Sequence, residues 1–290
     1  MSPFSPQEIK KAAQLLSERY RKGEKPYLRS VVDRHAYLIT RLPATQASLK
    51  KVLHELQGAQ IFSYLDIGAG PGGSWEILAE IFPTLQEASF VEIDLEFVKL
   101  GKDRLGGKPV HWIKEVNVKP HDLVLFSYSW GEIHNLSMLQ KAWELAQKFL
   151  VIVEPGTPRG YQAMLAARDH LIQQGAEVLA PCPHHRQCPW QGSPEWCHFG
   201  VRLERTREHQ RLKEGSLGFE DEKFSYIILS KEKVKPFYGR MVKDSLRRKG
   251  HTLLTLCTND GIETKTVSKK NDNYKNINKL NWGDKLIDNI

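Results

Sequence analysis

The chain has 290 residues, of which 40% are hydrophobic and 26% charged, so it can bury a sizeable core and carry one large domain with appendages. Its longest apolar runs, such as Phe149–Val153, are far shorter than the ~20 residues that a membrane helix needs. The first 20 residues lack the apolar core of a secretory signal. We therefore expect a cytoplasmic protein without a membrane partner, whose cysteines are reduced.

The net charge of +8 is concentrated at the two ends of the chain. Residues 1–60 hold 11 Lys and Arg against 5 Asp and Glu, and residues 231–290 hold 14 against 7, whereas the middle is net negative. A chain with two basic ends and an acidic middle could bind a polyanion through its ends. The alternative is that these charges are ordinary solvent-exposed surface residues. Aromatic and Gly residues between the C-terminal charges favour RNA, and we expect no DNA partner.

Strands alternate with helices along most of the chain. Amphipathic spacing predicts a helix over 7–22, and a second helix is expected from about 44, after Pro43. Apolar runs predict strands at 61–67, 88–94, 121–129 and 148–156, with helices from about 72 and over 95–105, 136–148 and 161–175. Later strands are expected at 198–205 and 224–231, followed by short strands joined by a turn at 259–261. This order predicts an α/β fold with a mostly parallel sheet covered on both faces.

A glycine-rich turn directly follows the first predicted strand. The run "LDIGAGPGG" places Asp66 at the end of the strand and then Gly68, Gly70 and Gly72, and glycines there allow a tight turn and close approach of a ligand. The form D-x-G-x-G-x-G resembles motif I of class I S-adenosylmethionine-dependent methyltransferases. That resemblance implies that these residues hold the methionine moiety, and that Glu92, with Asp94 as the weaker candidate, binds the ribose hydroxyls. A purely structural turn is the alternative.

No catalytic constellation accompanies this turn. The segment "SYSWGEIHNL" (127–136) lacks the motif that amino methyltransferases carry after the fourth strand. Cys182 follows a proline, as a nucleophile does in cytosine-C5 methyltransferases, but the second cysteine of that chemistry is absent. Glu132 and His134 could act as acid or base, or could equally cap a helix. The catalytic residues stay unknown, and so does whether the chain is an enzyme.

Three of the four cysteines lie in one irregular, Pro-rich loop. Cys182, Cys188 and Cys197 fall within residues 181–199, and Cys257 is distant. Four thiolates suit an iron–sulfur cluster or structural zinc. Zinc sites usually show closely spaced cysteine pairs, so the wide spacing favours a cluster, with zinc and four unrelated buried cysteines as alternatives. In either metal site the four ligands would join the loop to the basic C-terminal segment.

Several stretches together resemble the methyltransferase-like assembly factors of the mitochondrial ribosomal small subunit and their bacterial homologues. They are "YLITRLPATQASLKKVLHEL" (37–56), "LDIGAGPGG", "VEPGTPRGY" (153–161), the cysteine loop, "EKFSYIILSK" (222–231), "GHTLLTLCTNDG" and "YKNINKLNWGD" (274–284). The resemblance implies a Rossmann-like class I methyltransferase domain that binds S-adenosylmethionine, a [4Fe–4S] cluster on the four cysteines, and binding to small-subunit rRNA. Because the first residues do not read as a convincing transit peptide, we expect a bacterial-type cytoplasmic member, or a mitochondrial one in a eukaryote.

We therefore expect three parts: a helical segment (1–57), a methyltransferase-like domain that includes the cysteine loop (58–232), and a basic, β-rich RNA-binding extension (233–290). Tyr238 or Phe237 would stack on bases, and phosphates would contact Lys233, Lys235, Arg240, Arg247, Arg248 and Lys249. The first hypothesis is a ribosome assembly or translation factor. An active rRNA methyltransferase with a structural cluster or zinc site is the second, and a small-molecule methyltransferase with zinc is the third.

Overall fold

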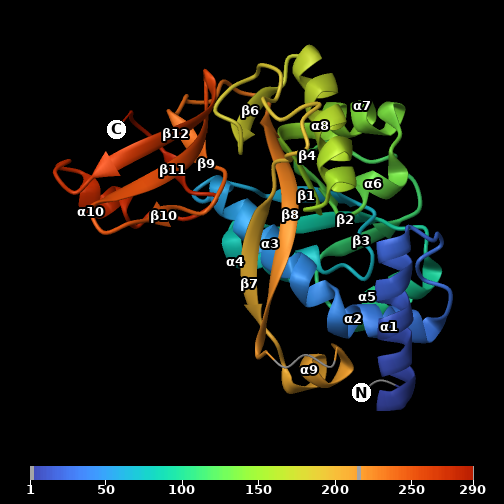
Figure 1. Cartoon of the computed structure of the whole chain (residues 1–290). Helices are drawn as coiled ribbons and strands as arrows, with labels where there is room; N and C mark the ends of the chain where they lie inside the picture. Colours follow the sequence, from blue (N-terminus) through green and yellow to red (C-terminus); the bar gives the residue numbers. More distant parts are fainter. Residues whose placement is uncertain (1–2, 214–216, 290) are drawn as a thin grey trace. The chain divides into compact units, whose positions relative to one another are not determined.

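The computed structural model describes residues 3–213 and 217–289, and the chain divides into two compact units. Unit 1 comprises Met1–Asn117 and Val201–Glu222, and unit 2 comprises Val118–Gly200 and Lys223–Ile290. The boundaries of these two units differ from the domain boundaries at 57 and 232 that we predicted from the sequence. The three predicted parts therefore stay a prediction. Figure 1 labels the elements along the chain.

The N-terminal helices of unit 1 are α1 (Pro6–Lys22), α2 (Val31–Thr40) and α3 (Leu42–Leu53), followed by the short η1 (His54–Leu56). Ser5 caps α1 in a capping box with Glu8, and Gly23 ends that helix in the left-handed conformation. Helix α3 begins at Leu42, with Pro43 in its first turn. Proline is tolerated there because N–H groups of the first turn have no hydrogen-bond partner within the helix. The break therefore precedes Pro43.

Helix α9 (Arg207–Lys213) contacts α1 and α2 (Figure 1). These three helices share a small apolar core made of Ile9, Ala12, Ala13, Ala36 and Leu212. Since α9 lies between β7 (Phe199–Glu204) and β8 (Phe219–Ser230), a segment late in the sequence completes the N-terminal core.

Three parallel strands form the sheet of unit 1, in the order β3-β2-β1. They are β1 (Ser63–Ile67), β2 (Glu87–Val91) and β3 (Val110–Ile113), connected by α4 (Ser74–Ile81) and α5 (Leu95–Arg104). This is the βαβ arrangement of nucleotide-binding α/β folds, in which ligands bind beyond the carboxyl ends of the strands. The sequence analysis missed β3, which is short and only partly buried.

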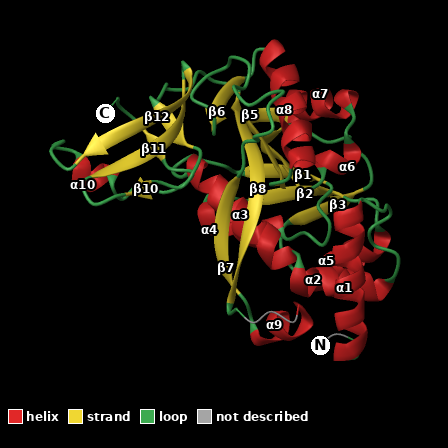
Figure 2. Ribbon diagram, in the orientation of Figure 1, coloured by secondary structure: helices red, strands yellow, loops and turns green. Residues whose placement is uncertain are grey.

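The large sheet of unit 2 is mixed. Strand β4 (His121–Ser127) is parallel to β5 (Ala146–Pro155), whereas β8 is antiparallel to both β5 and β6 (Glu177–Ala180). The helices of this part are α6 (Trp130–Ile133), α7 (Leu136–Leu145) and α8 (Pro158–Gln173) (Figure 2). The expected α/β class is confirmed, but the mostly parallel sheet is corrected to a mixed one, because β8 runs against its neighbours.

A second sheet in unit 2 is built from β9 (Gly239–Met241), β10 (Leu246–Arg247), β11 (His251–Thr258), β12 (Gly261–Ser268) and β13 (Lys285–Leu286), with α10 (Tyr274–Ile277). Strands β11 and β12 pair antiparallel up to Thr258 and Gly261, so the turn predicted at 259–261 is confirmed. This sheet has its own apolar core, made of Met241, Leu254, Leu256, Val267 and Ile277.

In the ranges that the structure describes, every helix is too short or too polar to cross a membrane.

Candidate functional site

The glycine-rich turn links the carboxyl end of β1 to the start of α4 in unit 1. Gly68, Gly70 and Gly72 have φ angles of 78°, 54° and 73°, in the left-handed region that favours glycine. A Cβ at Gly72 would lie 2.7 Å from the ring of Phe90 on β2, so the turn packs closely onto the neighbouring strand. Space around Gly70 is open, with no heavy atom within 4 Å of a built Cβ.

Asp66 lies beneath this turn and is only 1% exposed. The Ser74 hydroxyl donates a hydrogen bond of 2.5 Å to Asp66 Oδ2, and Tyr64 Oη lies 3.1 Å from Ser74 Oγ. In the described part of the chain, Asp66 Oδ1 has no hydrogen-bond partner. Burial raises the pKa of Asp66 to about 7, because a carboxylate without water is costly. The free oxygen of Asp66 is therefore available to a polar ligand group.

Glu92, just beyond β2, contacts the same turn. Its carboxylate accepts hydrogen bonds from the backbone N–H groups of Gly70 at 2.7 Å and Asp94 at 2.8 Å. Burial raises the pKa of Glu92, and these N–H groups oppose that shift. The structure thus places Glu92 beside the glycine turn, and its role as the ribose-binding acid stays a prediction.

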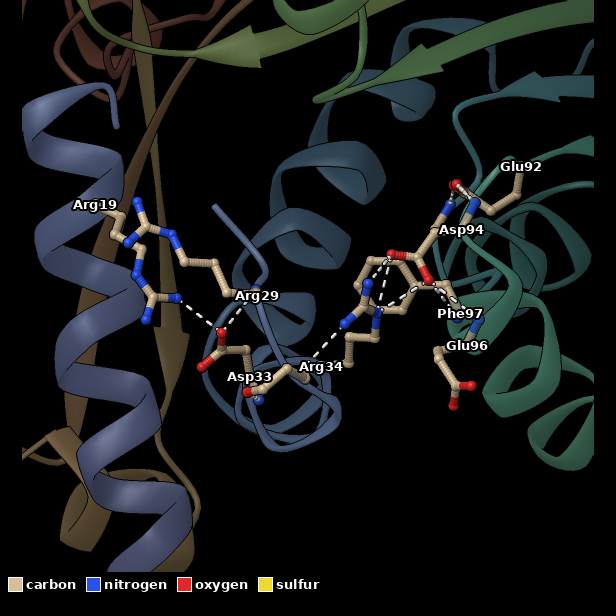
Figure 3. Close-up of polar contacts among 10 residues, drawn as sticks. Arg19, Arg29, Asp33, Arg34, Glu92, Asp94, Glu96 and Phe97 are labelled. Atoms are coloured by element: carbon tan, nitrogen blue, oxygen red, sulfur yellow. Dashed lines mark hydrogen bonds and ion pairs between the residues drawn. The ribbon is translucent and has the colours of Figure 1, made fainter. Parts of the chain in front are cut away.

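Asp94 has a different role from Glu92 (Figure 3). It caps α5 by accepting from the N–H groups of Glu96 and Phe97, and its carboxylate pairs with the guanidinium of Arg34 on α2. Arg34 also lies over the Phe97 ring, 5.8 Å from its centroid. Asp94 is thus committed to joining α2 to α5, which leaves Glu92 as the better candidate for a ligand hydroxyl.

The same view shows a second ion pair within the N-terminal helices. Arg19 on α1 pairs with Asp33 on α2 at 2.7 Å, and the N–H of Arg29 donates to the same carboxylate at 2.8 Å (Figure 3). Asp33 is almost fully buried, so this pair orients α1 against α2. It is structural and lies apart from the glycine turn in sequence.

The second candidate site is a small pocket in unit 2 that all four cysteines line. Cys182, Cys188 and Cys197 come from the loop after β6, and Cys257 comes from β11. The thiols are free, and Cys188 and Cys257 are buried. Within residues 3–213 and 217–289, no group of three or more His, Cys, Asp or Glu side chains is arranged to hold a metal ion. The predicted metal group on these cysteines therefore stays a prediction.

The pocket combines buried thiols with buried cations. Burial raises the pKa of Cys182, Cys197 and Cys257, and the neighbouring thiols raise it further. Arg168 on α8 and Arg240 on β9 are each 1% exposed, and their positive charges oppose the shift at Cys182. Two buried guanidinium groups beside four thiols favour a negatively charged occupant or ionised thiols.

Two further side chains contact the thiols directly. Tyr161 Oη donates a hydrogen bond of 3.2 Å to Cys188 Sγ, and His184 Nε2 lies 3.6 Å from Cys257 Sγ. Tyr161 and Arg168 are seven residues apart on α8, which places them on one face of the helix. The sequence analysis missed these residues, as it missed Ser74 and Tyr64, although the seven-residue spacing was visible in "YQAMLAAR".

Two of the expected RNA contacts are wrong. Arg240 is buried and donates hydrogen bonds to the carbonyls of Pro181 at 3.0 Å and Gly283 at 2.9 Å, so it cannot contact phosphate. Phe237 is only 5% exposed and cannot stack on a base. The remaining basic candidates are not buried: Lys233, Lys235, Arg247, Arg248 and Lys249.

One end of the second sheet gathers several basic side chains. The loop after β10 and the loop after β12 are joined by a hydrogen bond of 3.0 Å from the N–H of Lys269 to the carbonyl of Gly250. We call this the basic tip, which consists of the exposed residues Arg247, Arg248, Lys249, Lys269 and Lys270. Clustered exposed cations of this kind attract phosphate groups.

The segment after β4 contains strained backbone. Tyr128 and His134 have φ angles of 59° and 39°, and Gly131 between them donates its N–H to Glu154 Oε1 at 3.0 Å. Glu154 lies near the end of β5 and is 3% exposed, and burial raises its pKa to about 7. Neither Glu132 nor His134, the acid and base candidates, is buried. A strained loop on a buried carboxyl is often functional.

Replacing Asp66 with Asn should change how stability depends on pH. A carboxyl whose pKa is raised from about 4 to about 7 on folding contributes stability at low pH that is lost as pH rises through 7. The introduced amide cannot ionise and can still accept from Ser74. The difference in the free energy of unfolding, Asp66→Asn minus wild type, should therefore be about 2–3 kcal/mol larger at pH 8.5 than at pH 5.

Urea denaturation at the two pH values measures this difference. The control is Asp103→Asn, which removes an exposed carboxylate from the same unit and should give no pH-dependent gain. If Asp66→Asn changes the free energy of unfolding by the same amount at both pH values, the assigned ionisation of Asp66 is contradicted.

Some solved structures resemble the chain weakly. A precorrin-6y C5,15-methyltransferase from Geobacter metallireducens aligns with a TM-score of 0.44 and 16% identity, over 63% of this chain and 88% of its own. Magnesium protoporphyrin IX methyltransferase from Synechocystis, solved with bound S-adenosylmethionine, gives a TM-score of 0.42 and 12% identity, over 80% of this chain and 100% of its own. Likeness at this level says nothing about ligand or activity.

Sequence relatives are more informative. The human protein named ribosome assembly protein METTL17, mitochondrial, is 26% identical over 86% of this chain and 61% of its own length. The Rsm22-cox11 tandem protein 2, mitochondrial, of Schizosaccharomyces pombe is 24% identical over 86% of this chain and 42% of its own. The chain thus spans less than two thirds of these relatives. The model of the family described as "Mitochondrial small ribosomal subunit Rsm22" matches residues 31–287, so the chain belongs to the Rsm22 family.

Proposed function

We propose that this chain is a methyltransferase-like assembly factor of the small ribosomal subunit. It binds S-adenosylmethionine at the glycine turn of unit 1 and an iron–sulfur cluster at the cysteine pocket of unit 2, and it contacts rRNA through the basic tip. The observation that carries this proposal is the family match over 31–287, which includes the glycine turn and all four cysteines. Among the relatives, the human protein is named a ribosome assembly protein.

The residues of unit 1 fit S-adenosylmethionine. Its methionine amino group is cationic, and the buried Asp66 Oδ1 offers an oxygen without a partner in the described residues. The open space at Gly70 would admit the ligand close to the backbone, and Glu92 would accept hydrogen bonds from the ribose hydroxyls. When bound, this cofactor would supply an activated methyl group.

The residues of unit 2 supply the donors that an iron–sulfur cluster requires. All four thiols line one pocket, and a four-thiolate set is the usual ligand set of a [4Fe–4S] cluster, although structural zinc takes the same donors. Arg168 and Arg240 would balance the negative charge of the thiolates.

A second candidate function is methyl transfer to rRNA. The observation that favours it is the buried Glu154 carboxyl beside the strained segment of Tyr128 and His134. Incubating the protein with small-subunit particles and S-adenosylmethionine labelled in the methyl group separates the two functions. Ligand binding without transfer supports the assembly factor alone, whereas transfer that Glu154→Gln abolishes supports the enzyme. The site of action, cytoplasmic or mitochondrial, stays a proposal.

Anaerobic purification should yield about four irons and four sulfides per chain, with little zinc. Cys188→Ser should lose most of the iron and sulfide, because one of the four thiolates is removed. Gln187→Ala changes an exposed neighbour in the same loop and should retain both. Stoichiometric zinc from iron-replete cells, or unchanged iron in Cys188→Ser, would remove the cluster from the proposed function.

Binding to small-subunit rRNA should weaken steeply with salt, because cations released from phosphates drive the association. Replacing Lys249, Lys269 and Lys270 with Ala should reduce the slope of log affinity against log salt by about 2. Replacing Lys102 and Lys108, exposed lysines of unit 1, should leave the slope unchanged. A flat dependence in the wild type, or equal slopes in both variants, would exclude the basic tip as the RNA contact.

A further inference from the structure

Helix α8 provides two of the groups that contact the thiols of the cysteine pocket. The Tyr161 hydroxyl donates to Cys188 Sγ at 3.2 Å, and the buried positive charge of Arg168 opposes the rise in the pKa of the Cys182 thiol. The two helix residues lie two turns apart on one face and are 4% and 1% exposed. Each therefore reaches a different cysteine from a fixed position.

Other contacts hold these donors in place. Thr157 caps α8 by accepting from the N–H of Gly160, with Pro158 in the first turn. The guanidinium of Arg168 also donates to the carbonyls of His184 at 3.0 Å and Arg186 at 2.8 Å, and it pairs with Asp169 at 2.5 Å. Arg168 thus fixes the backbone of the cysteine loop on both sides of His185. A side chain with so many partners is pre-organised rather than free to move.

A hydrogen bond to a ligating sulfur withdraws electron density from it, and a nearby buried cation favours added negative charge. Reduction of a [4Fe–4S] cluster adds one negative charge, so both effects make reduction easier. We propose that Tyr161 and Arg168 are positioning residues that hold Cys188 and Cys182 and raise the reduction potential of the iron–sulfur group on the four cysteines. This inference rests on the proposed function, because it requires that group to be present.

The redox step itself is a one-electron transfer. An electron from an external reductant such as dithionite enters the cluster, no bond to Tyr161 or Arg168 is made or broken, and the phenol keeps its proton. The two residues therefore act through the hydrogen bond to sulfur and through charge, without taking part in the electron transfer. Their effect should appear in the potential of the cluster and not in the number of irons.

The test is a dithionite titration of the anaerobically purified full chain, followed by electron paramagnetic resonance of the reduced cluster. Tyr161→Phe removes only the hydroxyl, so iron and sulfide should stay near wild-type amounts while the potential becomes more negative. Arg168→Lys keeps the positive charge but loses the forked donor, and it should shift the potential in the same direction. Tyr20→Phe removes a hydroxyl from α1 in unit 1 and should leave the potential unchanged.

The outcomes separate the two claims. Wild-type protein without iron and sulfide would overturn the proposed cluster and this inference together. Loaded Tyr161→Phe and Arg168→Lys proteins with the wild-type potential would overturn only the inference. If Tyr161→Phe fails to fold, the Arg168→Lys titration alone decides, and an unchanged potential there again overturns it.

Discussion

The convergence of four thiols on one pocket is the constraint on which the organisation of unit 2 depends. Three of the thiols belong to an irregular loop and the fourth to β11, far later in the chain. A loop rich in Pro, Trp and His has few backbone hydrogen bonds of its own, so side-chain contacts must order it. A metal group on all four thiols would join this loop to the second sheet covalently.

Two buried arginines also join the segments that surround the pocket. Burial raises the pKa of Cys182, Cys197 and Cys257, and the positive charges of the two arginines oppose that shift at Cys182. Arg240 holds the loop to the second sheet through the carbonyls of Pro181 and Gly283, and Arg168 holds it to α8. Guanidinium groups present several donors in fixed directions, so each can bridge segments that are distant in sequence.

The elements that the sequence predicted well share a strong local signal. The turn with Gly68, Gly70 and Gly72, the capped helices α1 and α7, and the hairpin at 259–261 all depend on residues adjacent in the chain. The short strands β3 and β6 were missed, because four residues give too little periodicity. The mixed sheet was missed because strand direction depends on tertiary pairing.

The candidate sites follow the same division. Asp66 and Glu92 were predicted because each directly follows or ends an apolar strand, and their binding role stays a prediction. Ser74 was missed because its contact with Asp66 needs the turn to be folded. Arg240 was assigned to phosphate because it lies in a basic segment, and charge composition does not distinguish an exposed cation from a buried one. Burial of Arg240 depends on contacts with Pro181 and Gly283, which are distant from it in the sequence.

Hydrogen exchange of the anaerobically purified protein, before and after a chelator strips its metal, tests most directly whether the four thiols organise unit 2. If they bind one group, stripping should speed amide exchange in the loop 181–199 and in β9 and β11 together, since both segments lose the same anchor. Faster exchange in the loop alone, or in neither segment, would show that the cysteines do not join the two parts.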